Sequence, residues 1–361
     1  MSELQVSLLA IGIAVVLAVY GYNWQQQRQY RRKFGAAFKN GRSDALYGDA
    51  QEKPADEILA DAAVTQELPL EPAQADVTVE ERRLGAREYS LVDAATDYIA
   101  VLTLVNPANS HALEPLWQRR FDFGKGMHVY GLNVASNAWE KVIPESSPLY
   151  STFKLALQLA DRSGAASKVR LEDFRDLVRY IAGQAHAGAE LPDVDAAAAR
   201  ALELDGFCSE VDQMIGLNIL PGGERLFSGT EIAGLAGQYG MSLQADGAFH
   251  LPDAYGHTLF KLCSYDNTPF LHLTLDQMWV NGVTLLLDVP RVEEPAQRFS
   301  EMAVLARQMA MDLRASVVDD SRVALGDRSI AQILEQVAAI ENRMLSGKLA
   351  PGSAQARRLF S

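Results

Sequence analysis

Cysteine is scarce in this sequence, and basic residues are outnumbered by acidic ones. Only two of the 361 residues are cysteines, Cys208 and Cys263. This number excludes a disulfide-dense scaffold and is typical of a reducing compartment. Lys and Arg number 33 against 46 Asp and Glu, which gives a formal net charge of -13. Because a protein that neutralises phosphates needs a basic surface, we expect no nucleic-acid partner.

Histidine pairs suited to a metal ion are also missing. The six histidines never stand three or four positions apart, the spacing that places two ligands on one helix face. Cys263 falls in a predicted strand, where a small apolar role is commoner than that of a nucleophile. The turn at 221–223 lacks the Gly-Lys-Ser/Thr of a phosphate-binding loop. We therefore expect no metal, no cofactor and no catalytic residue.

One long hydrophobic run stands near the N-terminus. Residues 4–22 contain no charged side chain, and a helix of that length spans about 28 Å, close to the hydrocarbon thickness of a bilayer. A cleaved signal peptide needs a basic region before the run and a small-residue cleavage site after it, and neither is present. Glu3 is the only charged residue before the run, whereas six Lys and Arg residues follow it within residues 23–45. The charge asymmetry predicts a single-pass anchor, with residues 1–3 outside and the remainder cytoplasmic.

An acidic linker is predicted for residues 46–95, after the basic juxtamembrane segment 23–45. Residues 49–81 hold ten acidic side chains and one Lys, with few large apolar residues. Such a segment cannot bury enough surface to offset the entropy lost on ordering. A flexible chain of this length has a root-mean-square reach of about 40 Å, so we expect the globular part to work at a distance from the membrane.

The remaining sequence predicts two α+β halves, residues 96–205 and 206–361. In the second half, β-rich runs alternate with amphipathic segments in the order β-α-β-β-β-α-β-α. This order is typical of a mainly antiparallel sheet with its helices on one side. The predicted strands are 214–220, 248–251, 259–265, 282–289 and 316–319. The predicted helices are 228–240, with Ser228 or Thr230 as N-cap and Gly240 as stop, 295–313, and a last one carrying Ile330, Ile333, Leu334, Val337 and Ile340.

Strand alternation assigns the side chains of this second sheet to two faces. If Phe260 and Leu262 point to the helices, then Lys261, Cys263 and Tyr265 point away from them. The set that points away also includes, from the two neighbouring strands, Met214, Gly216, Thr284 and Leu286. We expect these residues to form a shallow, semi-apolar face suited to a helical or extended peptide. The alternatives are scattered apolar surface residues, or a face covered by the first half.

Four segments of the second half resemble the C-terminal FtsZ-binding domain of the ZipA family of cell-division proteins. They are 259–262 (LFKL), 282–290 (GVTLLLDVP), the helix at 299–313 and 317–322 (VVDDSR). The order of anchor, basic cluster, linker and C-terminal domain is similar too. The resemblance implies a single-pass protein of the bacterial inner membrane and of the divisome. It implies binding of the C-terminal peptide of FtsZ, the tubulin-like ring protein, tethering of the ring during septum formation, and no catalysis.

The resemblance also implies which residues touch the FtsZ peptide. Matching Asn218 to the family's Asn in its first strand places the first apolar residue of the groove at Met214, with Gly216 on the same face. Matching the LFKL segment places the family's strand-end Met at Tyr265 and its groove Phe at Leu286. The family has a bulky residue where Gly216 stands, so the groove should be shallower there. The linker also departs from the best-known family member, since it is short and acidic rather than long and Pro/Gln-rich.

The first half repeats the pattern of the second. The predicted strand 152–160 followed by a helix with Leu171, Phe174 and Val178 corresponds to the strand 282–289 followed by the helix at 299–313. The strand 98–105 likewise corresponds to 214–220. We interpret residues 96–205 as a diverged repeat of the ZipA-like domain, with an unrelated α+β domain as the alternative.

Two functions of different classes follow from this organisation. The first is a membrane-anchored adaptor that binds FtsZ. The second is a membrane-anchored enzyme or ligand sensor with a pocket between the two α+β halves. An adaptor should present a semi-apolar sheet face, whereas an enzyme should show converging His or carboxylate side chains in a closed cleft.

Overall fold

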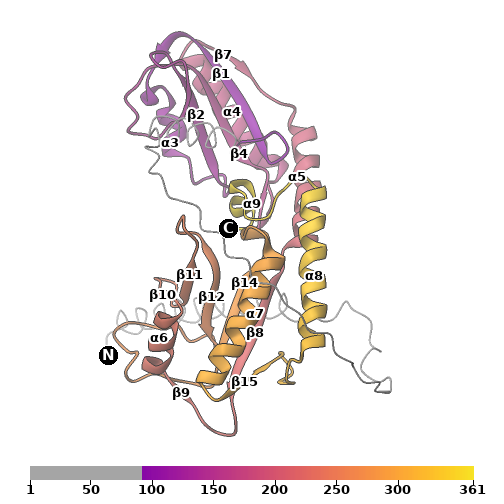
Figure 1. Ribbon diagram of the computed structural model, residues 1–361. Helices are drawn as coiled ribbons and strands as arrows, with labels where there is room; N and C mark the ends of the chain where they lie inside the picture. Colours follow the sequence, from indigo (N-terminus) through magenta and orange to yellow (C-terminus); the bar gives the residue numbers. More distant parts are fainter. Residues whose placement is uncertain (1–91) are drawn as a thin grey trace, which may run out of the picture. The chain divides into compact units, whose positions relative to one another are not determined.

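A computed structural model of the protein describes residues 92–361 (Figure 1). The predicted tail 1–3, anchor 4–22 and basic segment 23–45 lie outside the described residues, and so does the predicted linker 46–95 except for its last four positions. Among the helices of residues 92–361, none combines the length and the hydropathy needed to cross a bilayer.

The first sheet has the strand order β3-β2-β4-β1-β7, and every neighbouring pair is antiparallel. The described elements of this half are β1 (Asp97–Ala108), η1 (Ser110–Leu113), α3 (Glu114–Gln118), β2 (Met127–Asn133), β3 (Trp139–Lys141), β4 (Tyr150–Gln158), β5 (Ala160–Asp161), β6 (Gly164–Ala165), α4 (Lys168–Gln184), β7 (Ala187–Glu190) and α5 (Val194–Val211).

Side-chain alternation fixes which face of the first sheet packs on helices. Tyr98 and Leu102 of β1 are fully buried, while Thr103 beside them is exposed. Opposite them lies Phe174 of α4, whose ring meets that of Tyr98 edge-on with centroids 6.0 Å apart. The side chain of Ser167 caps α4 by accepting the N–H of Arg170. The first half therefore has its own helix-packed core.

The second sheet has the order β10-β11-β12-β14-β8-β15, again with antiparallel neighbours. The elements of this half are β8 (Met214–Pro221), β9 (Phe227–Ser228), α6 (Gly229–Gln238), β10 (Ser242–Leu243), β11 (Phe249–Pro252), β12 (Thr258–Ser264), β13 (Trp279–Val280), β14 (Val283–Asp288), η2 (Val289–Arg291), α7 (Pro295–Asp312), β15 (Ala315–Val318), α8 (Asp327–Ser346) and α9 (Ala354–Leu359).

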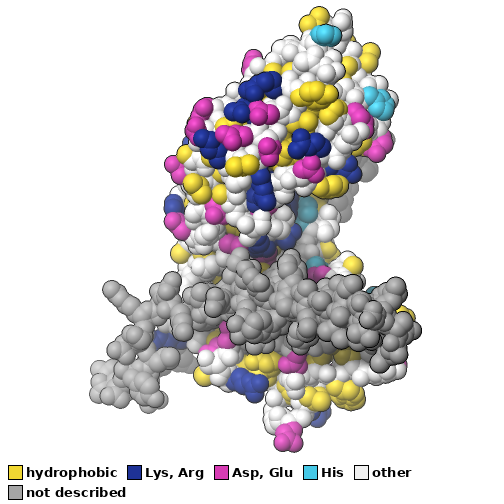
Figure 2. Space-filling model, turned by 180° about the vertical axis from the view of Figure 1, so that it is seen from behind, with side chains coloured by type: hydrophobic (Ala, Val, Ile, Leu, Met, Phe, Trp, Pro, Cys, Tyr) yellow, Lys and Arg dark blue, Asp and Glu magenta, His cyan; other side chains and the backbone are white. Residues whose placement is uncertain are grey.

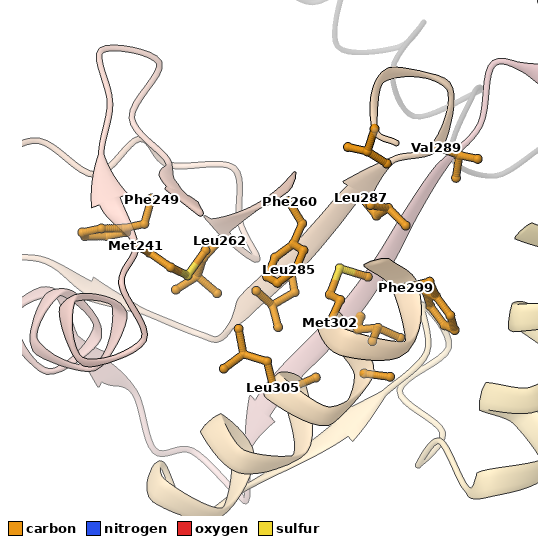
Figure 3. Packing of buried hydrophobic residues seen from close by; sticks show 14 of the residues in the cluster. Met241, Phe249, Phe260, Leu262, Leu285, Leu287, Val289, Phe299, Met302 and Leu305 are labelled. Carbon is orange, nitrogen blue, oxygen red and sulfur yellow. The ribbon is translucent and has the colours of Figure 1, made fainter. Parts of the chain in front are cut away.

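The core of the second half lies between this sheet and α7. In Figure 3, Phe260 and Leu285 from the strands lie close to Met302 and Leu305 of α7. Leu285 and Met302 have no exposed surface, and full burial of an aliphatic side chain of this size contributes roughly 1.5 to 3 kcal/mol. Helix α8 packs on α7. The predicted α+β class, with antiparallel sheets packed on helices, is thus confirmed.

The two sheets share an arrangement of four strands. The order β2-β4-β1-β7 in the first corresponds to β12-β14-β8-β15 in the second. The next strand outward differs, because β3 follows β2 in the chain whereas β11 precedes β12. The shared part fits a duplication and the edge strand departs from one, so the diverged repeat stays a prediction.

Helix α5 belongs to both cores. Its residues Ala197 and Ala201 pack in the first core, and Cys208 and Val211 pack in the second. The division predicted between residues 205 and 206 falls inside this helix. The two halves therefore share a continuous helix.

The C-terminal segment adds a second connection between the halves. The guanidinium of Arg358 in α9 binds the carboxylate of Asp97 at 2.7 Å, and the side chains are 11% and 0% exposed. The side-chain amide of Gln158 donates to the carbonyl of Arg358. A buried ion pair therefore joins the segment after α8 to β1.

Candidate functional site

The outward face is the face of the second sheet turned away from α7. In the ladders, Lys261 of β12 lies opposite Leu286 of β14, and Leu286 lies opposite Gly216 of β8. One step along, Cys263 lies opposite Thr284, and Thr284 lies opposite Asn218. Residues opposite one another in an antiparallel ladder share a face. The register therefore brings the predicted residues of three strands together in two rows.

Burial follows the predicted alternation on β12 and β14. Leu262, Val283, Leu285 and Leu287 have no exposed surface. The residues predicted to point away from the helices are all half-buried: Met214, Gly216, Lys261, Cys263, Tyr265, Thr284 and Leu286. Tyr265 lies one position beyond the end of β12, where its N–H donates to the carbonyl of Gly282.

Leu286 and Thr284 border the space above Gly216. A Cβ atom added at Gly216 would lie 3.8 Å from Leu286 Cδ1 and 3.3 Å from Thr284 Cγ2. The second distance is tight for a carbon contact, so a larger residue would require Thr284 to move. The two β14 side chains thus line the position at which the sequence predicts a shallower groove.

A chain of polar groups closes one end of the outward face. The hydroxyl of Thr284 donates to Asn218 Oδ1 at 2.8 Å, and Asn218 Nδ2 donates to a carboxylate oxygen of Asp320 at 3.0 Å. Asn218 is only 3% exposed, so these bonds satisfy a buried amide. Beside them the guanidinium of Arg322 lies over the ring of Tyr265, 5.9 Å from its centroid. The loop after β15 therefore forms this border.

A second polar border lies on the β11 side. His250 lies opposite Lys261 in the ladder, and its Nε2 is 3.0 Å from a carboxylate oxygen of Asp246. Lys261 Nζ lies 3.4 Å from the same carboxylate. Burial acts to raise the pKa of Asp246, but the hydrogen bond from His250 and the charge of Lys261 outweigh it and lower the pKa. A carboxylate is thus held beside the only cation predicted for this face.

The third border comes from the first half. Asp288 lies opposite Met214 in the β14–β8 ladder and accepts from Arg162 at 2.7 Å, and Arg162 also binds Asp212 at 2.6 Å. Burial raises the pKa of Asp288, although Arg162 opposes that rise. Burial acts to lower the pKa of Arg162, but its hydrogen bonds to Asp288 and Asp212 reverse the effect and raise it. The first half therefore places an ion pair at the Met214 end of the face.

Sequence reasoning missed these border residues. Asn218 serves in the sequence to match the first strand, and neither its partner Asp320 nor the pairing of His250 with Asp246 is predicted. Arg162 is more than a hundred positions away from Asp288, and only the fold brings the two together. The only signal available was the polar character of Asn218, His250 and Asp288 within strands, because Arg162, Asp246 and Asp320 lie outside the strands.

Converging catalytic groups are not found on the described residues of this face. Among residues 92–361, no group of three or more His, Cys, Asp or Glu could hold a metal ion. Burial raises the pKa of Cys263, so the thiol form prevails at neutral pH.

Cys263 offers a direct probe of the face. Its raised pKa predicts slow alkylation by iodoacetamide at pH 7, with a rate that keeps rising with pH beyond the usual thiol range of about 8.5. A peptide seated on the face should slow alkylation of Cys263 several-fold, measured by mass spectrometry. Cys208, which is 6% exposed and has a pKa raised by burial to about 12, should stay unreactive with or without peptide. An unchanged Cys263 rate under saturating peptide would place the binding surface elsewhere.

Charge over the surface gives no sign of a nucleic-acid site. In the view of Figure 2, basic and acidic side chains of the described residues lie next to one another, and the basic ones form no continuous stripe. A half-buried, semi-apolar sheet face with polar borders and a helix-packed core behind it is the kind of surface on which α+β domains bind a peptide.

The comparison with known families is specific about which domain this is. Residues 213–336 match the family described as ZipA, C-terminal FtsZ-binding domain. The resemblance predicted from the sequence is confirmed for this part of the chain. No curated protein gives a significant match to the chain. The family match supports FtsZ binding in cell division, and the family is one of protein-binding domains rather than enzymes.

Proposed function

We propose that this protein is a membrane-anchored cell-division adaptor whose outward face binds the C-terminal peptide of FtsZ. The observation that carries the proposal is the position of Leu286. It stands on the middle strand of the three that carry the predicted residues, between Lys261 and Gly216, and it is half-buried although it points away from the core. An apolar side chain at the centre of a face with polar borders is the usual anchor of a peptide site.

The polar borders suit a short amphipathic peptide. Apolar side chains of the peptide would pack on Leu286 and on Met214 near the Arg162 border. Lys261 lies in the same row as Leu286 and can pair with a peptide carboxylate, although Asp246 already lies near it. Thr284 and Asn218 satisfy each other's polar groups, so they do not require partners from the peptide. Binding would thus depend mainly on apolar contact.

The tether belongs to the same proposal. The charge-free run 4–22 and the six basic residues after it support a single-pass anchor in the bacterial inner membrane. The acidic segment would then separate the globular halves from the bilayer. The N-terminus would lie outside and the domains in the cytoplasm, and a reporter enzyme fused after Ser361 should be active only in its cytoplasmic form.

Recruitment of FtsZ to vesicles tests the proposal as a whole. The full chain reconstituted in lipid vesicles should bring fluorescent FtsZ filaments to the vesicle surface. FtsZ lacking its C-terminal peptide should stay in solution, because the outward face would then have no ligand. Equal recruitment of both forms would show that the peptide is not what this protein recognises. If the chain itself did not remain with the vesicles, the anchor would be wrong, whatever the domain binds.

A further inference from the structure

The connection between β12 and β14 carries exposed apolar side chains. We call residues 271–279 the Leu-Trp loop. Leu273 is 93% exposed, Trp279 62% and Leu271 50%. Within 270–280 the only charged residue is Asp276. Exposed large apolar side chains gathered in one short segment of a soluble domain mark an interaction site.

The fold holds this loop at both ends. Phe270 and Val280, which flank it, are 1% and 2% exposed, and the ring of Phe270 lies 5.1 Å from that of Phe249 in the core. At the base, Asn281 Nδ2 donates to Asp266 Oδ2 at 2.7 Å. Leu271, Leu273 and Trp279 therefore project from an anchored segment.

A fourth exposed apolar residue comes from the neighbouring segment. Trp279 of β13 lies opposite Ser228 of β9, and Leu226 stands immediately before β9, in the segment that this pairing brings next to β13. Leu226 is 41% exposed. Two separate parts of the chain thus contribute apolar side chains to one surface.

The size of this surface argues against a second copy of the chain. A stable dimer needs roughly 20 to 30 residues a side, and this surface offers four large apolar side chains on a turn and a two-stranded ribbon. The four side chains instead suit a bilayer interface, which requires no complementary shape. Trp in particular prefers the level of the lipid headgroups, where its ring is in an apolar layer and its N–H stays hydrated.

We infer that the Leu-Trp loop, with Leu226, is a second membrane contact that inserts into the headgroup region of the bilayer. The inference rests on the proposed anchor, which keeps the domain within the reach of the linker. If the domain were free in solution, these four side chains would hold it to lipid only weakly. A tether raises the effective concentration of the surface to the millimolar range, so that a weak contact becomes populated. The contact is apolar, and the net charge of -13 gives no attraction to anionic lipid.

One experiment tests whether the anchor and the loop each contact the bilayer, in the same sample. The full chain is labelled with 5-fluorotryptophan and placed in lipid nanodiscs, with and without a nitroxide lipid, and its four fluorine signals are assigned by single Trp→Phe changes. Trp279 should broaden several-fold more than Trp117, which lies in the first core and is 7% exposed. Trp24, which lies two positions beyond the last residue of the predicted anchor, reports the anchor itself.

Each pattern of broadening has one meaning. If Trp24 and Trp279 both broaden, the second contact is supported. If Trp24 broadens and Trp279 stays as sharp as Trp117, the second contact is wrong while the anchor stands. If Trp279 broadens and Trp24 does not, the loop contact is supported and the anchor is wrong. If neither broadens, both are wrong.

A double variant separates insertion from mere proximity. Leu271→Gln with Leu273→Gln removes the apolar side chains without touching the core, and it should reduce the broadening of Trp279 to that of Trp117. Binding of the FtsZ peptide should be unchanged, which also checks that the domain is folded. Undiminished broadening in this variant would show that the loop does not insert.

Discussion

Leu286→Glu should lower the affinity for the FtsZ C-terminal peptide by at least thirtyfold while the protein stays folded. A central apolar residue of a peptide site typically contributes about 2 kcal/mol or more, which corresponds to that factor. Glu at this position would also bring a charge against the apolar part of the peptide. Because Leu286 points away from α7, its replacement leaves the packed core intact.

Fluorescence anisotropy of a labelled peptide measures this effect, and circular dichroism shows whether the variant is folded. The matched control is Leu285→Asp, one position earlier on the same strand. Leu285 has no exposed surface and lies between Leu262 and Leu217 in the ladders. An unpaired charge there costs several kcal/mol, so the control should unfold the domain. If a folded Leu286→Glu bound as tightly as the wild type, the peptide would bind on another face.

Arg358→Ala should destabilise the protein by about 3 kcal/mol or more, since removing one partner of a buried ion pair leaves the other charge uncompensated. The remaining carboxylate, Asp97, is fully buried and keeps only the hydroxyl of Thr96 and the N–H of Asp93 as donors. Urea unfolding of residues 92–361, followed by tryptophan fluorescence, measures the change.

An exposed ion pair serves as the control for this effect. Arg343 and Glu210 also pair across the chain, at 2.8 Å, but their side chains are 53% and 58% exposed. Arg343→Ala should therefore cost less than about 1 kcal/mol. Replacing both buried partners, as in Asp97→Asn with Arg358→Leu, should cost less than Arg358→Ala alone. Equal losses in the two single arginine variants would mean that burial of the Arg358 pair has no energetic weight.

The two faces of the second sheet could be predicted from the sequence, because the alternation that defines them involves neighbouring residues only. In β14, alternation of Val283, Leu285 and Leu287 with Thr284 and Leu286 is a property of neighbouring residues, and the pleat of the strand converts it directly into two faces. The order of strands and helices along the chain then predicted that the strands form one mainly antiparallel sheet. The role of the seven face residues in binding stays a prediction.

The connections between the halves could not be predicted in the same way. The pairing of Arg162 with Asp288 depends on how two distant segments meet in space, and no spacing in the sequence encodes it. Helix α5 was missed because its small side chains, such as Ala197 and Ala201, give a weak periodic pattern. It is their packing in the first core that identifies them as interior.

A continuous α5 also determines how the protein carries mechanical load. If the protein is anchored as proposed, a filament bound to the second sheet would pull against a tether that begins before β1, and the force would pass through both halves. Helix α5 runs from the first core into the second without a break, and Arg358 of α9 links the second half directly to Asp97 at the start of β1. The tension would be divided between these two connections, so the two cores would resist it together.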